Sequence, residues 1–359
     1  MSARLLLLTP NLDNNSLGRT YCLWLLARAC GMSVTVASPK GERVWAPLAE
    51  HELAAACHRV APLEPGGSLD PRLLAMARDC DLVVAVKPVE NSFGLGLALT
   101  RATGRPLLLD VDDPDIEVRT TWLPWPERAA RRLLTPRYRT LRRLRQEATR
   151  VPLLVSNPEL QRMYGGRLVP HVREAAPAGA PSASRHPVVR FVGSVRPHKG
   201  VDVLRAAVAR LHGRGFTLEV TGAAPPDTAP WERWLGTTSL AEGERLVATA
   251  DVVAVPSLAS EWSPAQLPVK LVDALTAGAC VVASHVGPVP WALDGSGVLV
   301  PPGDVDALTD ALAGLADPAR RAELGRRART RALQAFSVEA VAPVFAEEVA
   351  AACRTSATA

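Results

Sequence analysis

Short apolar runs alternate with helix-like segments along the whole chain. In the first half, continuously apolar runs predict strands at 4–9, 33–37, 81–86, 106–110 and 152–156, with helices at 20–29, 71–79, 92–103 and 157–164. In the second half, strands are predicted at 188–192, 217–221, 251–256, 280–284 and 297–300, with helices at 201–212, 240–249, 268–277 and from 305 onwards. Strands without polar alternation are typical of parallel sheets with both faces covered. The pattern therefore predicts doubly wound α/β structure.

Two domains are expected, because 359 residues are about twice the usual length of one domain. Residues 174–187 are rich in Ala, Pro, Gly and Ser and have no apolar period, which favours a linker. We predict Rossmann-like domains at 1–173 and 188–336, and a C-terminal helix at 337–359 that packs back towards the first domain. The carboxyl ends of the two sheets would face each other across a cleft.

Composition excludes several classes of protein. Apolar residues make up 48% and charged residues 21%, as in globular proteins. The apolar runs are too short for a membrane span or a signal peptide, and the six cysteines form no Cys-x-x-Cys motif, so we expect reduced thiols and a cytoplasmic protein. With only 4% aromatic residues, binding of single-stranded nucleic acid is not expected.

The positive charge is concentrated in one segment. Residues 119–150 contain ten arginines and two glutamates, whereas the net charge of the whole chain is +5. The spacing of Tyr138, Leu141 and Leu144 predicts a helix with arginines on its outer faces, which Pro136 separates from the preceding segment. The stretch between Arg128 and Arg150 has three interpretations: a solvated surface, a contact with an anionic membrane, or a contact with an acidic carrier protein.

A glycine-rich segment with two cations follows the first strand of the second half. This strand ends at Gly193, a loop carries Arg196 and Lys199, and a helix begins after Gly200. Free backbone amides and the helix dipole favour anions where a helix begins, so the segment suits a diphosphate. The alternative is a solvated loop whose charges are incidental.

A second segment places charged residues at the start of another helix. A strand ends at Pro256, and the helix begins near Pro268, a residue type favoured in a first helical turn. Lys270 and Asp273 are three residues apart and so share one face of this helix.

Taken in order, these segments resemble the family-4 retaining glycosyltransferases of GT-B fold. The resemblance covers the second half, including Gly297-Val-Leu-Val-Pro-Pro-Gly-Asp304 and the arginine-rich helix after Asp317. It continues more weakly through Leu17-Gly18-Arg19 and Val155-Ser-Asn-Pro-Glu-Leu160 in the first half. It implies that the second domain binds a nucleotide sugar and the first domain binds the acceptor.

The resemblance also assigns residues to the donor. Lys199 matches the lysine on the donor diphosphate, and Arg196 replaces an arginine that usually stands at Ser194; both are expected to take part in catalysis. Asp273 matches the acidic residue on the ribose. Ala265 stands where the family has a glutamate for the sugar hydroxyls, and Glu261 is a candidate replacement or a surface residue. The remaining donor residues are expected to be Gly18, Gly193, Ser194, Gly222, Leu235, Gly236, Pro256, Leu267, Val269 and Lys270.

The first half offers a second group of candidates at the ends of its strands. Lys87 follows Val86, which stands where the family often has a histidine, and is either a catalytic residue or a surface lysine. Asp110 is a candidate general base. The acceptor contacts are expected to be Asp112, Asp113, Asn15 and Arg19. Aspartates two apart can also hold a divalent cation or cap a turn, but the resemblance implies no metal.

The expected function is transfer of a sugar, with retention, from a nucleotide sugar to a small or carrier-bound acceptor. The donor is expected to be a UDP-sugar, with no metal or other cofactor, in bacterial natural-product biosynthesis. Two alternatives are transfer to a lipid by an enzyme peripheral at the membrane, and a non-catalytic nucleotide-sugar-binding protein. A dehydrogenase is disfavoured, because neither half has the Gly-x-Gly-x-x-Gly motif.

Overall fold

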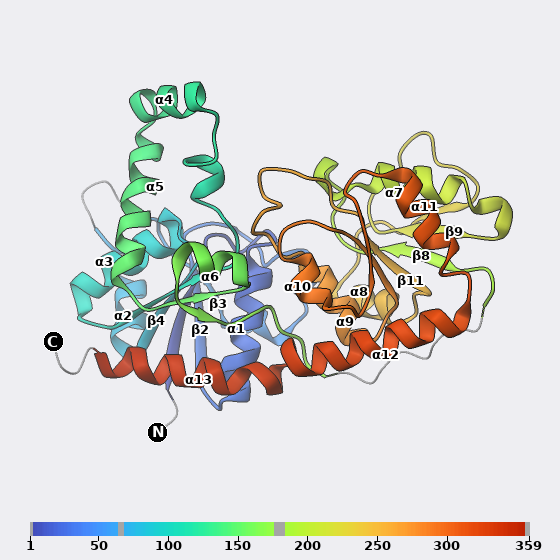
Figure 1. Ribbon diagram of the computed structural model, residues 1–359. Coiled ribbons are helices and arrows are strands. Elements are labelled where there is room, and N and C mark those ends of the chain that lie inside the picture. The colour runs from blue at the N-terminus through green and yellow to red at the C-terminus, as the bar shows by residue number, and fades with distance from the viewer. Residues whose placement is uncertain (1–2, 64–67, 176–183, 356–359) are drawn as a thin grey trace. The chain divides into compact units, whose positions relative to one another are not determined.

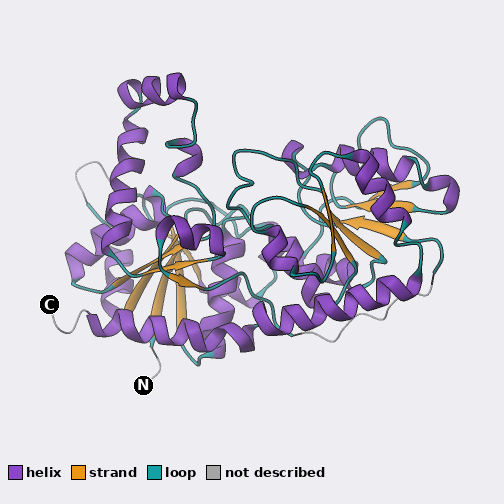
Figure 2. Cartoon of the chain, viewed as in Figure 1, coloured by secondary structure: helices purple, strands orange, loops and turns teal. Residues whose placement is uncertain are grey.

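The computed structural model describes residues 3–63, 68–175 and 184–355 (Figure 1). The chain forms two compact units. The first comprises Met1–Val172 together with Val341–Ala359, and the second comprises Arg173–Ala340. In each unit, helices cover both faces of a sheet whose strands are all parallel (Figure 2). The predicted fold of two Rossmann-like α/β domains is thereby confirmed.

The sheet of the first unit has seven strands in the order β3-β2-β1-β4-β5-β6-β7. The chain starts at the centre of the sheet with β1, proceeds outwards to β3, and returns to continue on the other side from β4. The point between β1 and β4 is therefore the topological switch point of this sheet. The strands are β1 Arg4–Leu8, β2 Ser33–Ser38, β3 Cys57–Arg59, β4 Leu82–Val86, β5 Leu107–Val111, β6 Leu153–Val155 and β7 Arg167–Leu168.

Six helices connect these strands, and a seventh returns from the end of the chain. In chain order they are α1 Leu17–Ala29, α2 Pro71–Asp79, α3 Leu95–Thr103, α4 Trp125–Leu134, α5 Pro136–Glu147 and α6 Pro158–Tyr164. The seventh is α13 Val338–Thr355, of which the part from Val341 onwards packs with this unit.

The sheet of the second unit repeats the same plan, with the order β10-β9-β8-β11-β12-β13. Its switch point lies between β8 and β11. The strands are β8 Val188–Phe191, β9 Thr217–Val220, β10 Glu232–Trp234, β11 Val252–Val255, β12 Val281–Ser284 and β13 Val298–Val300. The helices are α7 Val201–Ala209, α8 Leu240–Ala248, α9 Val269–Ala277, α10 Val289–Leu293, α11 Val305–Ala313 and α12 Pro318–Ala335.

Strand β11 shows why the strands are continuously apolar. Val252 and Ala254 belong to the hydrophobic core on one face of the sheet, together with residues of α7 and α11. Val253 and Val255 belong to the core on the other face, together with residues of α9 and α12. Successive side chains of a strand point to opposite faces, so a strand between two helix layers needs apolar residues at every position.

Most predicted elements lie within two residues of their positions in the structure, but α4 and four further α-helices and strands were missed. Three of these four are the short strands β3, β7 and β10, which lie at the ends of the sheet orders and contain charged residues. The fourth is the five-residue helix α10. The helix predicted at 92–103 is a π-helical turn, Glu90–Gly94, followed by α3. Part of the predicted linker, 176–183, lies outside the described residues.

The basic segment forms two helices, of which the second, α5, was predicted, together with its separation from the preceding residues at Pro136. α4 ends at Leu134, and Thr135 has an extended backbone, with φ −120° and ψ 108°, before Pro136 begins α5. A proline disfavours helical geometry in the residue that precedes it. Among the described residues, no helix is both long and apolar enough to span a bilayer.

Candidate functional site

The carboxyl ends of β8 and β11 meet at the switch point of the second sheet. Val252 pairs with Val189 and Val253 with Arg190, so the register places Gly193 beside Pro256 just beyond the two strands. Gly193 has φ +131°, a conformation that L-residues other than glycine rarely adopt. In open parallel sheets, ligands bind outside the carboxyl ends of the strands at this point.

Close packing of two loops holds the segment that leads from Gly193 to α7. A short 3₁₀ turn, Pro197–Lys199, is followed by Gly200 with φ +68°. A Cβ atom on Gly200 would lie 1.9 Å from the carbonyl oxygen of Pro256, so only glycine fits. The amide of Leu258 also donates a hydrogen bond to the carbonyl of His198, at 2.9 Å. The loop that carries the cations is therefore fixed against the loop after β11.

Lys270 brings a buried positive charge to the same point. It lies in the first turn of α9, and only 9% of the residue is exposed. Its Nζ atom lies 3.3 Å from the centroid of the Phe191 ring and 3.5 Å from the position of a Cβ on Gly193. Among the described residues, Nζ has no hydrogen-bond partner. Burial and the charge of Lys199 lower the pKa of Lys270 well below its usual value.

The other two predicted cations lie near Lys270. Lys199 Nζ donates to Gln266 Oε1 at 3.4 Å, and Arg196 is exposed at the start of the 3₁₀ turn. Partial burial and the charges of Lys199 and Arg196 lower the pKa of His198, with Lys270 acting in the same direction and Glu261 in the opposite one. Three positive charges and one negative charge thus surround this histidine, and the net potential favours an anion.

Neighbouring strand ends supply a glycine-lined edge. The Gly193 amide donates to Thr221 Oγ1 at 2.7 Å, and the Thr221 hydroxyl donates to the Gly193 carbonyl at 3.0 Å. Gly222 and Gly236 exchange backbone hydrogen bonds of 2.8 and 3.1 Å, and Leu235 donates to Val220. The structure therefore brings Gly193, Gly222, Leu235 and Gly236 together at the carboxyl edge of the sheet, and their expected contact with the donor stays a prediction.

The remaining donor candidates lie in the loop before α9, at the first residue of α9 and, for Ser194, after β8. Glu261 and Ser194 are exposed, Val269 is half-buried, and Leu267 is buried. Ala265 is fully buried, and its methyl side chain offers the site no carboxylate. Glu261 has no ion pair among the described residues, and its expected contact with donor-sugar hydroxyls stays a prediction.

Asp273 forms an ion pair that sequence reasoning missed. Its Oδ1 atom lies 2.6 Å from Nε of Arg173. The backbone amide of Arg173 donates a hydrogen bond to the carbonyl of Phe336 at 2.9 Å. The carbonyl of Arg173 accepts one from the amide of Val338 at 3.0 Å. Burial raises the pKa of Asp273, and Arg173 opposes this rise. No motif marks Arg173, because its partner is a hundred residues away along the chain.

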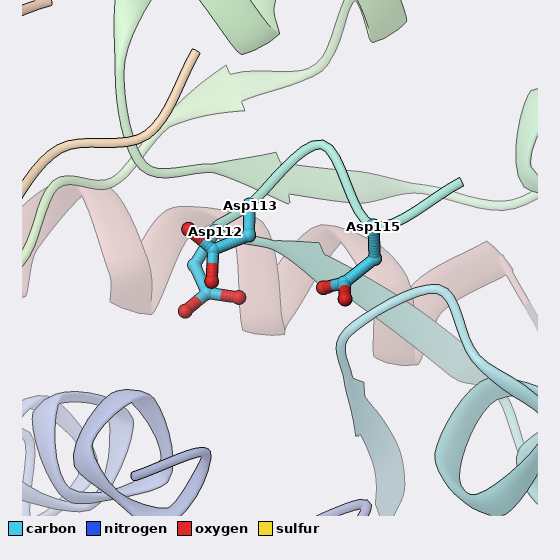
Figure 3. Close-up of side chains that lie close together, drawn as sticks. All are labelled: Asp112, Asp113 and Asp115. Atoms are coloured by element: carbon cyan, nitrogen blue, oxygen red, sulfur yellow. The ribbon is translucent and has the colours of Figure 1, made fainter. Parts of the chain in front are cut away.

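In the first unit, Lys87 lies at the switch point between β1 and β4. Its φ is +71°, which is rare for a residue with a side chain. Its Nζ atom lies 2.8 Å from Asp112, 2.6 Å from Asp113 and 3.1 Å from Asp115, the three carboxylates of Figure 3. Arg119 also contacts Asp115, at 2.9 Å. We call these five residues the lysine–aspartate cluster.

The lysine–aspartate cluster balances its own charges. Burial disfavours the ammonium, but the three carboxylates together raise the pKa of Lys87 well above its usual value. Burial raises the pKa of Asp112 to about 7, although Lys87 opposes this rise. The carboxylate oxygens lie close enough together to hold a metal ion. The ammonium of Lys87 occupies that position, however, and would repel a divalent cation.

Arg19 and Asp110 form a fully buried ion pair. Arg19 donates to both carboxylate oxygens of Asp110, at 2.9 and 2.6 Å, and to the carbonyls of Val169 and Pro170. Neither side chain is exposed to solvent. We therefore correct the prediction for these two residues. They tie α1 and β5 to the segment after β7, and are not placed for acceptor contact or proton transfer.

The two other candidates of the first unit lie around the start of α1. Asn15 is exposed, and its carbonyl accepts a hydrogen bond from the amide of Gly18 at 3.1 Å. Gly18 is half-buried in the first turn of α1, and a Cβ there would lie 3.8 Å from the Trp45 ring. Asn15 lies in the loop between β1 and α1, Gly18 lies in α1 itself, and the expected ligand contacts of both stay predictions.

A family model matches part of the second unit. Residues 186–317 match the family model of the glycosyl transferases group 1. This region contains Gly193, Arg196, Lys199, Lys270 and Asp273. The group 1 match therefore falls on the unit that carries the anion-binding features.

Two curated relatives align with part of the chain. It is 33% identical over 175 residues to the MMP alpha-(1->4)-mannosyltransferase of Mycolicibacterium hassiacum, covering 44% of this chain and 41% of that protein. It is 34% identical over 214 residues to the D-inositol 3-phosphate glycosyltransferase of Saccharomonospora viridis, covering 52% of this chain and 48% of that protein. The aligned part thus spans less than half the length of either relative.

Solved structures share the fold over almost the whole chain. Anabaena HepE, solved in complex with UDP and glucose, has a TM-score of 0.75 and 18% sequence identity, covering 97% of this chain and all of that one. At this level of identity the likeness establishes the fold, which is that of the GT-B glycosyltransferases.

Proposed function

We propose that the protein is a glycosyltransferase that takes a sugar from a nucleoside diphosphate sugar. The observation that carries the proposal is Lys270, a buried lysine whose Nζ atom has no hydrogen-bond partner among the described residues. An unpaired buried charge is costly, so such a group is retained where a ligand supplies the opposite charge. A diphosphate bound at Gly193 would provide it, and Lys199 and Arg196 lie close by.

The same residues suit the chemistry of the leaving group. As the bond between the sugar and the diphosphate breaks, negative charge grows on the diphosphate oxygens. Cations that are held in place beforehand stabilise this charge without reorganisation. Lys270 is fixed by burial, and the loop of Lys199 is fixed by the packing of Gly200 against Pro256. Side chains of the second unit thus take the role of a metal, and we propose metal-independent transfer.

The finer assignment rests on the relatives and on the family resemblance. We propose UDP as the nucleotide, because HepE was solved with UDP and glucose. We propose retention of the anomeric configuration and a small or carrier-bound acceptor in bacterial natural-product biosynthesis. Nucleotide-sugar binding without catalysis is a second candidate, favoured by the buried Ala265, which leaves its position without a carboxylate for the sugar.

Turnover with labelled UDP-, GDP- and dTDP-sugars distinguishes these functions. Lys199→Ala is expected to lower kcat/KM by about 100- to 1000-fold, because it removes one preorganised charge partner. The matched control is Lys40→Ala, an exposed lysine of the first unit. The anomeric configuration of the product, read by NMR, tests retention. Near-normal kcat/KM in Lys199→Ala would refute the site, and nucleotide binding without turnover would support the second candidate.

A further inference from the structure

The two helices of the basic segment form a surface of their own within the first unit. Figure 1 shows α5 leading away from the sheet of this unit, with α4 at its far end. Tyr138, Leu141 and Leu144 anchor the inner face of α5, where all three are buried. Arg145 also points inwards, where it contacts Glu117 at 3.2 Å and lies over the Tyr164 ring. The pair of helices α4 and α5 is therefore a fixed part of the unit.

The outer faces of α4 and α5 carry several positive charges that no acidic side chain balances among the described residues. Arg131 pairs with Glu127 and Arg150 with Glu147. Five further arginines are exposed and have no ion pair among the described residues: Arg132, Arg137, Arg139, Arg142 and Arg143. The salt bridges to the rest of the chain that one interpretation expected are therefore absent for these five side chains among the described residues.

The same segment exposes large apolar side chains. Within the described residues, five large hydrophobic side chains are exposed, and three of them belong to residues 122–134. Trp125 is 72% exposed and Leu134 is 80% exposed, at the two ends of α4, and Trp122 is 37% exposed just before it. These apolar side chains are close in sequence to the exposed arginines, and exposed apolar groups among polar ones are typical of an interaction site.

We propose that the α4–α5 surface, residues 122–143, docks onto an anionic membrane surface. Charge complementarity decides the partner, because arginines on the outer faces of both helices can each meet lipid phosphates without a fixed pattern of partner charges. Tryptophan is favoured at the level of the lipid headgroups, and Leu134 would bury its side chain beside the acyl chains. Trp125, Leu134 and the unpaired arginines thus act together, with the protein lying on the bilayer.

Vesicle co-sedimentation of the full chain tests this inference. We expect binding to phosphatidylcholine vesicles containing about 30% phosphatidylglycerol, little binding to phosphatidylcholine alone, and weaker binding when NaCl rises from about 0.1 to 0.5 M. Because each cation near such a surface contributes about 1 kcal/mol, Arg139→Glu/Arg142→Glu/Arg143→Glu should lower the partition coefficient at least 100-fold. Trp125→Ser/Leu134→Ser should lower it about tenfold or more through lost apolar burial.

Control variants at matched exposed positions separate this surface from general effects. Leu333→Ser and Arg326→Glu/Arg327→Glu lie on α12 of the second unit and should leave vesicle binding unchanged. Thermal unfolding of every variant verifies that it folds. No binding to anionic vesicles would overturn the inference. Vesicle binding that the α4–α5 variants leave intact would also overturn it. So would vesicle binding that requires the arginines, does not require Trp125 and Leu134, and is competed by poly-glutamate. This last outcome would show that the surface binds polyanions through charge alone and does not enter the lipid.

Discussion

Replacing Lys270 with methionine should make the unliganded protein more stable and its nucleotide binding weaker. Methionine keeps most of the side-chain length and removes the charge. Burying an ion costs several kcal/mol, and the contact with the Phe191 ring returns about 2 kcal/mol at most. A net gain of about 2 kcal/mol in the free energy of unfolding is therefore expected, or about 4–8 °C in Tm for a unit of this size.

Bound nucleotide should stabilise the unsubstituted protein more than it stabilises the Lys270→Met variant. UDP at about 100 times its Kd stabilises a protein by about 2.7 kcal/mol. Losing a charged contact worth about 1.5–3 kcal/mol weakens binding by about 10- to 100-fold, which reduces that stabilisation to about 0.4–1.4 kcal/mol at the same concentration. Thermal unfolding with and without UDP measures both effects in one assay, with Lys40→Met as the matched control. A variant that is less stable and keeps its full UDP shift would refute this account of Lys270.

The contribution of Lys270 to the free energy of unfolding should depend on pH with a defined sign. Because the pKa of Lys270 is lowered in the folded protein, the unfolded chain binds more protons between that value and about 10.4. The penalty on stability is therefore fully present below the folded pKa and disappears as pH rises through this window. Binding of a diphosphate requires the ammonium, so the UDP-induced rise in Tm should shrink over the same window. In Lys270→Met, both trends should be absent.

Two more predictions concern the first unit. Turnover should survive excess EDTA, because Lys87 already occupies the position between the carboxylates of Asp112, Asp113 and Asp115. If activity is instead lost on chelation and restored by Mn²⁺ or Mg²⁺, the three aspartates form a metal site. Arg19→Met should lower the free energy of unfolding by about 3–5 kcal/mol in urea titrations, because it leaves the carboxylate of Asp110 buried and unpaired. Removing both charges in Arg19→Met/Asp110→Leu should recover much of this loss, and a cost below about 1 kcal/mol for the single variant would contradict a structural role.

The strands that the sequence predicted well are those at the centres of the sheets. β4 and β11 are apolar at every position because helices cover both of their faces, and that pattern is visible in the chain. β3 and β10 contain residues such as Cys57-His58-Arg59 and Glu232-Arg233-Trp234. These short strands at the ends of their sheets form because their backbones pair with a neighbouring strand. Their sequences therefore contain no apolar pattern from which a strand could be predicted.

The site could be predicted only as far as local spacing determines it. Gly193, Lys199 and Lys270 stand at strand ends and helix starts, so their placement followed from the predicted elements. Whether a charge is paired depends on distant residues. Asp110 is 91 residues from Arg19 along the chain, and the pairing turns an expected general base into a buried structural group. Burial and pairing belong to the tertiary structure and could not be inferred from spacing alone.

The two switch points differ in how their charges are balanced, and this difference argues for the second unit as the nucleotide site. Both sheets place a lysine near their central strand ends. In the first unit, Lys87 is enclosed by three carboxylates, so an anion approaching it would meet negative charge. In the second unit, Lys270 has no hydrogen-bond partner among the described residues, and Lys199 adds a second positive charge. A diphosphate with two or more negative charges is therefore attracted to the second switch point and repelled by the carboxylates at the first.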